Sequence, residues 1–104
     1  MASSLTQTYK CQLAGVTFHK QAFTEAKVAT GERLTLKAEP TNAYDVFAIA
    51  VYKGARHVGY VPRTHNMLIH LALVQRPQAV VCLAEAVRPG ACTLRITIKP
   101  EEPA

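Results

Sequence analysis

Two stretches of the chain alternate strictly between apolar and polar residues. In residues 33–39 the apolar positions are Leu34, Leu36 and Ala38, and each is flanked by charged or polar residues. Residues 92–99 repeat the pattern, with an apolar residue at every even position. A period of two is typical of a strand with one buried face, because successive side chains point to opposite sides of the sheet. Both stretches are therefore predicted to be half-buried strands.

Four further strands and one main helix complete the pattern. The strands are predicted at residues 13–18, 47–52, 56–61 and 79–87, with turns at residues 53–55 and 89–90. Pro62 has the fixed φ that is favoured at a first helical position, so a helix is expected from residue 62 to about residue 74. Helical spacing assigns its apolar face to Met67, Leu68, Leu71 and Ala72. Residues 19–32 show neither period cleanly and are expected to form a loop with one short helical turn.

These elements predict a mostly β fold. A sheet of six strands in a chain of 104 residues has edges that must be closed or covered, and a small closed barrel achieves this. Periodicity alone leaves an OB-like and an SH3-like barrel equally open. Residues 1–8 are expected to be a flexible tail, residues 9–99 a single domain, and residues 100–104 a frayed end.

Charge points weakly to an anionic partner. The formal net charge is +5, and surface Lys and Arg attract phosphates at long range. The twelve basic residues are scattered along the chain without a run, however, and many basic domains are simply solvated surfaces.

The chain lacks the motifs of common catalytic and metal sites. It has no G-x-S-x-G, Walker or H-E-x-x-H motif, and no cysteine pair with C-x-x-C spacing. His65 and His70 are five residues apart, which puts them on different sides of a helix. We therefore expect no enzymatic activity, no metal and no cofactor. Cys11, Cys82 and Cys92 are expected to be small buried hydrophobes.

The sequence also carries expectations about location. No apolar run reaches the roughly 20 residues needed to cross a bilayer, and residues 1–10 lack the apolar core of a signal peptide. We expect a cytoplasmic protein with free thiols and no membrane contact.

Residues 39–63 resemble a known family. The pattern EP-x-N-x-YD-x-x-AIAV at residues 39–51, followed by VGYVPR at residues 58–63, is similar to the HIRAN domain, and the segment LAGVTF at residues 13–18 extends the likeness upstream. The resemblance covers roughly residues 10–73 and suggests a stand-alone HIRAN domain of bacterial or phage type. It implies a modified OB-like barrel, a fold that presents a strand face and its loops to nucleic acid.

The resemblance also implies a binding site. In HIRAN domains that grip DNA, aromatic residues at the places of Phe18 and Tyr44 hold the terminal base of a single strand between them. Asn42 and Asp45 match the positions that hold the 3′-terminal nucleotide, with the Asp carboxylate accepting a hydrogen bond from the 3′-hydroxyl. The alternatives are that Phe18 is a core residue, that Tyr44 packs inward, and that Asn42 and Asp45 only shape the loop.

Basic side chains complete this expected site. His19, Lys20 and Arg63 lie next to the matched segments and are candidates for phosphate contacts, and the alternative for each is a solvated surface position. The chain departs from the family pattern at Thr17, Thr41 and Phe47. Thr17 stands where DNA-end-binding members have arginine, which predicts weaker phosphate binding.

Two functions follow as hypotheses. The first is a non-catalytic module that binds single-stranded DNA, preferably at a 3′ end, in DNA repair or replication. The second is a protein-interaction or adaptor module that acts on a helicase or nuclease without gripping DNA.

Overall fold

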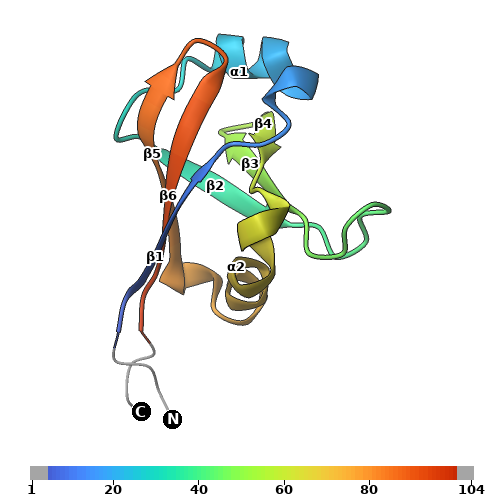
Figure 1. The fold of residues 1–104 in the computed structure, drawn as a ribbon, viewed down its shortest axis with the longest axis vertical. Coiled ribbons are helices and arrows are strands. Elements are labelled where there is room, and N and C mark those ends of the chain that lie inside the picture. Colours follow the sequence, from blue (N-terminus) through green and yellow to red (C-terminus); the bar gives the residue numbers. More distant parts are fainter. Residues whose placement is uncertain (1–4, 101–104) are drawn as a thin grey trace.

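The computed structural model describes residues 5–100, in which six antiparallel strands form one sheet in the order β1-β6-β5-β2-β3-β4 (Figure 1). The strands are β1 (Gln7–Gln12), β2 (Arg33–Ala38), β3 (Ile49–Lys53), β4 (Arg56–Tyr60), β5 (Val80–Arg88) and β6 (Ala91–Ile98). The helices are the 3-10 turn η1 (Val16–His19), α1 (Lys20–Ala26), α2 (Arg63–Gln75) and the 3-10 turn η2 (Pro77–Ala79). No helix in this part of the chain is long and apolar enough to cross a membrane.

The sheet curls until its two outer strands approach each other. Just after β1, the backbone of Ala14 exchanges two hydrogen bonds with Tyr60 at the end of β4, each with an N···O distance of 2.8 Å. We call this bridge the seam. It joins the first and last strands of the sheet order into a half-barrel and confirms the predicted OB-like fold.

Gly59 permits the seam to form. A Cβ atom at this position would lie 2.6 Å from the carbonyl oxygen of Ala14 and 2.8 Å from the Cδ1 atom of Leu13. Real Cβ atoms do not approach a backbone oxygen so closely, so only glycine lets the two segments meet at this separation.

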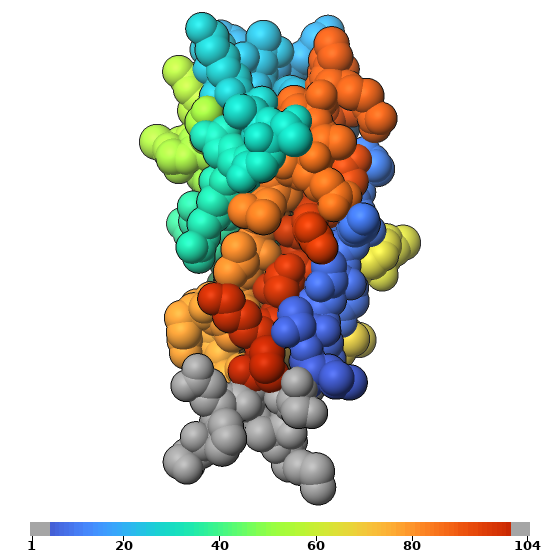
Figure 2. All heavy atoms as spheres, turned by 90° about the vertical axis from the view of Figure 1, so that its left-hand side faces the viewer, coloured from blue at the N-terminus to red at the C-terminus, as the bar shows by residue number. Residues whose placement is uncertain are grey.

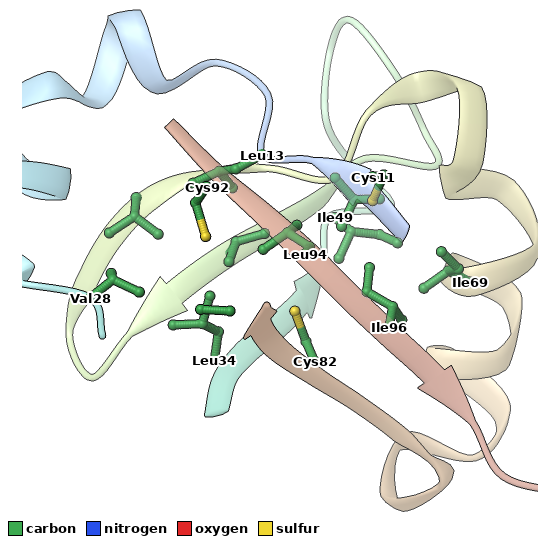
Figure 3. Close-up of a cluster of buried hydrophobic side chains, with 14 of the residues drawn as sticks. Cys11, Leu13, Val28, Leu34, Ile49, Ile69, Cys82, Cys92, Leu94 and Ile96 are labelled. Carbon is green, nitrogen blue, oxygen red and sulfur yellow. The ribbon is translucent and has the colours of Figure 1, made fainter. Parts of the chain in front are cut away.

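The core lies inside the curled sheet. Cys92, Leu94, Ile96 and Ile98 of β6 are all buried, as the alternating pattern predicts, and they meet side chains from β1, β2, β3 and β5 (Figure 3). Ile69 of α2, with no exposed surface, packs into the same cluster. Cys11, Cys82 and Cys92 are buried free thiols, as expected. Burial raises the pKa of Cys82 to about 12 and that of Cys11 to about 11, so both stay protonated and unreactive near neutral pH.

The predicted first strand is wrong in its position. Strand β1 occupies Gln7–Gln12, whereas residues 16–19 form η1 instead of extending the strand. Gly15 has a φ of 70°, a left-handed conformation that turns the chain out of the extended direction. Gln7 and Thr8, placed in the tail by the sequence, pair with Ile98 and Thr97 of β6. The expected tail and end otherwise fall largely on residues 1–4 and 101–104, which lie outside the described part of the chain.

The predicted apolar face of α2 is also wrong, except at Ala72, which is partly buried against the core. Met67, Leu68 and Leu71 are 50%, 59% and 44% exposed, whereas the buried positions of the helix are Asn66, Ile69 and His70. Two polar contacts fix this orientation: Asn66 donates to Asp45, and the Nδ1 atom of His70 lies 3.2 Å from the carbonyl oxygen of Ala48. The face of α2 that carries Asn66 and His70 is therefore turned toward the loop before β3, where these two side chains satisfy polar groups of the loop.

Two smaller differences concern α1 and the β5–β6 hairpin. Helix α1 spans seven residues, more than the single turn expected. Regular pairing around a turn at residues 89–90 would place Cys92 opposite Val87 and Cys82 opposite about Thr97. Cys92 does lie opposite Val87, but Cys82 lies opposite Ile96. The register shifts between Ala84 and Ala86, because a bulge places one extra residue in β5.

Candidate nucleic-acid interface

A cleft of about 440 Å³ lies beside the seam, between the chain leaving β1, the loop before β3 and the start of α2. Its lining residues are Ala14, Gly15, Phe18, Asn42, Tyr44, Asp45, Ala48, Tyr60, Val61, Arg63 and Asn66. Volumes of this order are typical of sites for small ligands. Five of the seven site residues expected from the sequence, Phe18, Asn42, Tyr44, Asp45 and Arg63, meet here.

Phe18 and Tyr44 are the most exposed large side chains of the cleft. Their relative exposures are 89% and 92%, so neither is a core residue and neither packs inward. Phe18 lies on η1 and Tyr44 on the loop between β2 and β3, so two segments far apart in the sequence each bring one ring to the same cleft. Aromatic faces exposed in this way are suited to stacking on a planar ligand.

Asn42 shapes the loop that carries Tyr44. Its Oδ1 atom accepts hydrogen bonds from the backbone N–H groups of Tyr44 and Asp45, at 2.8 and 3.1 Å. Its Nδ2 atom donates to Oε1 of Glu39 at 3.0 Å. This is the loop-shaping role that the sequence left open as an alternative, and it holds the backbone of Tyr44 in a fixed turn.

Asp45 ties the same loop to α2. Its Oδ1 atom accepts from the backbone N–H of Phe47 at 2.9 Å, and its Oδ2 atom accepts from Nδ2 of Asn66 at 2.7 Å. The hydrogen bond from Phe47 lowers the pKa of the Asp45 carboxyl, and the contacts with Asn66 and Arg63 act in the same direction. The group is therefore an anion at neutral pH. Each carboxylate oxygen can accept a further hydrogen bond, because the pair offers about four acceptor positions.

Arg63 supplies the positive charge of the cleft. Its Nε atom lies 3.5 Å from Oδ2 of Asp45, while 79% of its side chain remains exposed. A guanidinium held loosely by one carboxylate keeps donors free for a phosphate.

His19 and Lys20 lie outside the cleft. They line a neighbouring hollow of about 380 Å³, which we call the side hollow, together with Phe18, Gln21, Ala22, Glu25 and Arg56. The ring of His19 lies 4.1 Å from that of His57, measured between centroids. Burial lowers the pKa of His19 and the nearby His57 lowers it further, so His19 is uncharged near pH 7. It offers a hydrogen bond but no charge to a phosphate.

Sequence reasoning missed Asn66 and Tyr60 as site residues. Tyr60 lines the cleft, and its hydroxyl donates to Oε1 of Glu39 at 3.0 Å. Asn66 follows Arg63 by three residues, about one helical turn, and this spacing was the available signal. Phe47, which departs from the family pattern, packs edge-on against the buried ring of His70 with a centroid distance of 5.6 Å.

The described residues 5–100 contain no group of three or more His, Cys, Asp or Glu side chains that could hold a metal ion.

Comparisons with known proteins identify the architecture. The family model of the HIRAN domain matches residues 6–100. The crystal structure of a protein from Lactobacillus plantarum is similar, with a TM-score of 0.74 and 17% identity, over 94% of this chain and 100% of that one. The HIRAN domain of human HLTF is similar with a TM-score of 0.65 and 17% identity, over 88% of this chain and 74% of that one. A search of the curated proteins found no match.

Proposed function

This chain belongs to the HIRAN domain family, whose members are in general DNA-binding modules, and from that premise we propose that it binds single-stranded DNA, preferably at a 3′-hydroxyl end, without catalysing a reaction. One observation carries the proposal: two exposed aromatic rings, Phe18 and Tyr44, line a single cleft that also contains a carboxylate and an arginine. A nucleotide has a planar base, a phosphate and a sugar hydroxyl, and these groups match the three kinds of side chain.

Each group of the nucleotide is assigned to side chains of the site. The terminal base stacks between Phe18 and Tyr44, an interaction worth about 1 to 3 kcal/mol per base and insensitive to sequence. The exposed guanidinium of Arg63 contacts a phosphate, and Lys20 in the side hollow meets the next one. The Asp45 carboxylate accepts a hydrogen bond from the free 3′-hydroxyl, since an ionised acceptor forms the stronger kind of hydrogen bond.

The proposal extends to the setting of the protein. A module that recognises a strand end without cutting it fits a cytoplasmic role in DNA repair or replication, beside a helicase or nuclease that performs the chemistry.

The first test compares single-stranded with blunt duplex DNA by fluorescence anisotropy. We expect the single strand to bind better, because a paired and stacked end has no free base face for Phe18 and Tyr44. With about two to four phosphate contacts, log K should fall with log salt at a slope of roughly −1.5 to −3. The absence of binding at low salt would contradict the proposal.

The second test addresses the 3′ end. Wild-type protein is expected to prefer a 3′-hydroxyl oligonucleotide to its 3′-phosphate counterpart by about tenfold or more, equivalent to about 1.4 kcal/mol, because a phosphate would face the Asp45 carboxylate. Asp45→Asn should narrow this difference while it retains an acceptor for the N–H of Phe47. A 5′-phosphate on the same oligonucleotide serves as the control and should leave the affinity unchanged. Equal affinity of the wild type for the two 3′ ends would exclude end recognition.

The outward face of α2 supports a second candidate function. Met67, Leu68, Leu71 and Val74 are 44% to 59% exposed, and a cluster of exposed apolar residues is typical of a protein-binding surface. An adaptor that docks a helicase or nuclease through this face would not need DNA in the cleft. The DNA titration above separates the two candidates, because only the first requires binding to the oligonucleotide.

A further inference from the structure

Helix α1 lies beside the tip of the β5–β6 hairpin at one end of the molecule (Figures 1 and 2). A larger hollow lies between the two, on the side of α1 that faces the hairpin. We call it the hairpin pocket. It has a volume of about 740 Å³ and is lined by Lys20, Phe23, Thr24, Lys27, Val28, Val87, Arg88, Pro89 and Gly90. No acidic residue is among them. The pocket thus combines an apolar floor with three cationic side chains.

Helix α1 connects this pocket to the cleft. Lys20, Phe23 and Thr24 follow the spacing i, i+3, i+4, which places them on one face of the helix, toward the hairpin, and Lys27 lines the same pocket as the residue that ends the helix. Lys20 also lines the side hollow, and the side hollow shares Phe18 with the cleft. The cleft, the side hollow and the hairpin pocket therefore follow one another, with Phe18 at the first junction and Lys20 at the second.

The charges of the hairpin pocket are not neutralised. Within residues 5–100, Lys20, Lys27 and Arg88 have no acidic partner, whereas Lys10, Lys53 and Arg56 pair with Glu85, Glu32 and Glu25. In the side hollow, too, the one acidic residue, Glu25, is already paired with Arg56. Among the described residues that line the three hollows, the acidic ones are Asp45 and Glu25, and each is paired with an arginine.

We propose that the hairpin pocket binds the nucleotides on the 5′ side of the terminal one, so that a strand held by its end in the cleft crosses Lys20 and continues between α1 and the hairpin. This inference rests on the proposed function. Lys20, Lys27 and Arg88 contact the phosphates, and the apolar floor of Phe23, Val28 and Val87 receives a base. The seven residues of α1 span about 10 Å, the length of about three stacked nucleotides at 3.4 Å each. Together with the terminal nucleotide, the site covers about four nucleotides, which is the lower end of the range of about 4 to 16 nucleotides for an OB fold.

The test measures affinity against strand length. Unlabelled 3′-hydroxyl oligonucleotides of increasing length, from a dinucleotide to a decanucleotide, compete with a labelled strand for the wild-type protein. Each has one 3′ end, so length adds no statistical advantage for end binding. We expect the affinity to rise up to about four or five nucleotides and then to level off.

Paired variants assign the length effect to the pocket. Lys27→Gln with Arg88→Gln should weaken octanucleotide binding by about tenfold through the lost phosphate contacts and leave dinucleotide binding unchanged. The matched control is Lys37→Gln with Lys99→Gln, which removes the same charge from exposed positions that line none of the three hollows.

The possible failures are distinguishable. If the wild type binds the dinucleotide and the octanucleotide equally, or if both double variants weaken octanucleotide binding to the same extent, the hairpin pocket has no specific role and the inference is overturned while end binding stands. If no oligonucleotide of any length binds, the proposed function itself fails and the inference fails with it.

Discussion

Replacement of Tyr44 by alanine is expected to weaken single-stranded DNA binding by about 1 to 3 kcal/mol, or roughly 5- to 150-fold, because one of the two stacking faces for the terminal base is removed. The melting temperature should hardly change. The Tyr44 side chain is 92% exposed, and the hydrogen bond that fixes this position uses its backbone N–H, which alanine retains. Fluorescence anisotropy and thermal unfolding of the same sample measure both effects.

Val46→Ala is the matched control for this variant. Val46 lies in the same loop and is 58% exposed, but it does not line the cleft. Its truncation should leave DNA affinity unchanged. Wild-type affinity in the Tyr44 variant would show that the exposed ring takes no part in binding.

Replacement of Gly59 by alanine is expected to destabilise the fold by about 1 to 3 kcal/mol, because the new methyl group collides with atoms that cannot easily move away. The closest of them is the backbone oxygen of Ala14, at 2.6 Å. Ala14 precedes Gly15 and η1, so relief of the collision must shift the wall of the cleft that carries Phe18. We therefore expect a lower urea midpoint together with weaker DNA binding, although Gly59 does not itself line the cleft.

Gly54→Ala separates the two effects. Gly54 has a φ of 58°, so alanine is strained there by about 1 to 2 kcal/mol, but no atom lies within 4 Å of the added Cβ. This variant should lose stability and keep its DNA affinity. A Gly59→Ala protein with the wild-type urea midpoint and affinity would mean that the seam adjusts without cost.

Local chemistry made much of the fold predictable. Strict alternation located β2 and β6, Gly54 and Gly90 marked the two tight turns, and Pro62 marked the residue before α2. These features depend on residues adjacent in sequence, so the sequence is sufficient to reveal them.

Features that depend on distant contacts were not predictable in the same way. The orientation of α2 is fixed by hydrogen bonds from Asn66 to Asp45 and from His70 to Ala48, over 21 and 22 residues. A pattern of apolar residues does not contain this information, and it selected the exposed face instead. The start of β1 was missed because the apolar run through residues 13–18 hides the left-handed turn at Gly15.

The candidate site, too, was predictable only in those features that depend on residues adjacent in sequence. The family likeness of the loop pointed to Asn42, Tyr44 and Asp45, but it could not tell which of their polar atoms already have partners within the protein. It also grouped His19 and Lys20 with Phe18 because they are neighbours in the chain. Phe18 lines both the cleft and the side hollow, whereas His19 and Lys20 lie outside the cleft.

The seam is also a place where a bound ligand can stabilise the half-barrel. The Ala14–Tyr60 bridge is an isolated pair instead of a run of paired strand residues, and its two residues both line the cleft. A strand end that contacts both Phe18 and Tyr44 would connect the segment after β1 with the loop before β3, much as the two hydrogen bonds connect that segment with β4. Ligand binding and formation of the seam would then be thermodynamically linked, and each would favour the other to the same extent. A DNA end would in this way strengthen the barrel at the place where an isolated bridge joins the segments next to its outer strands.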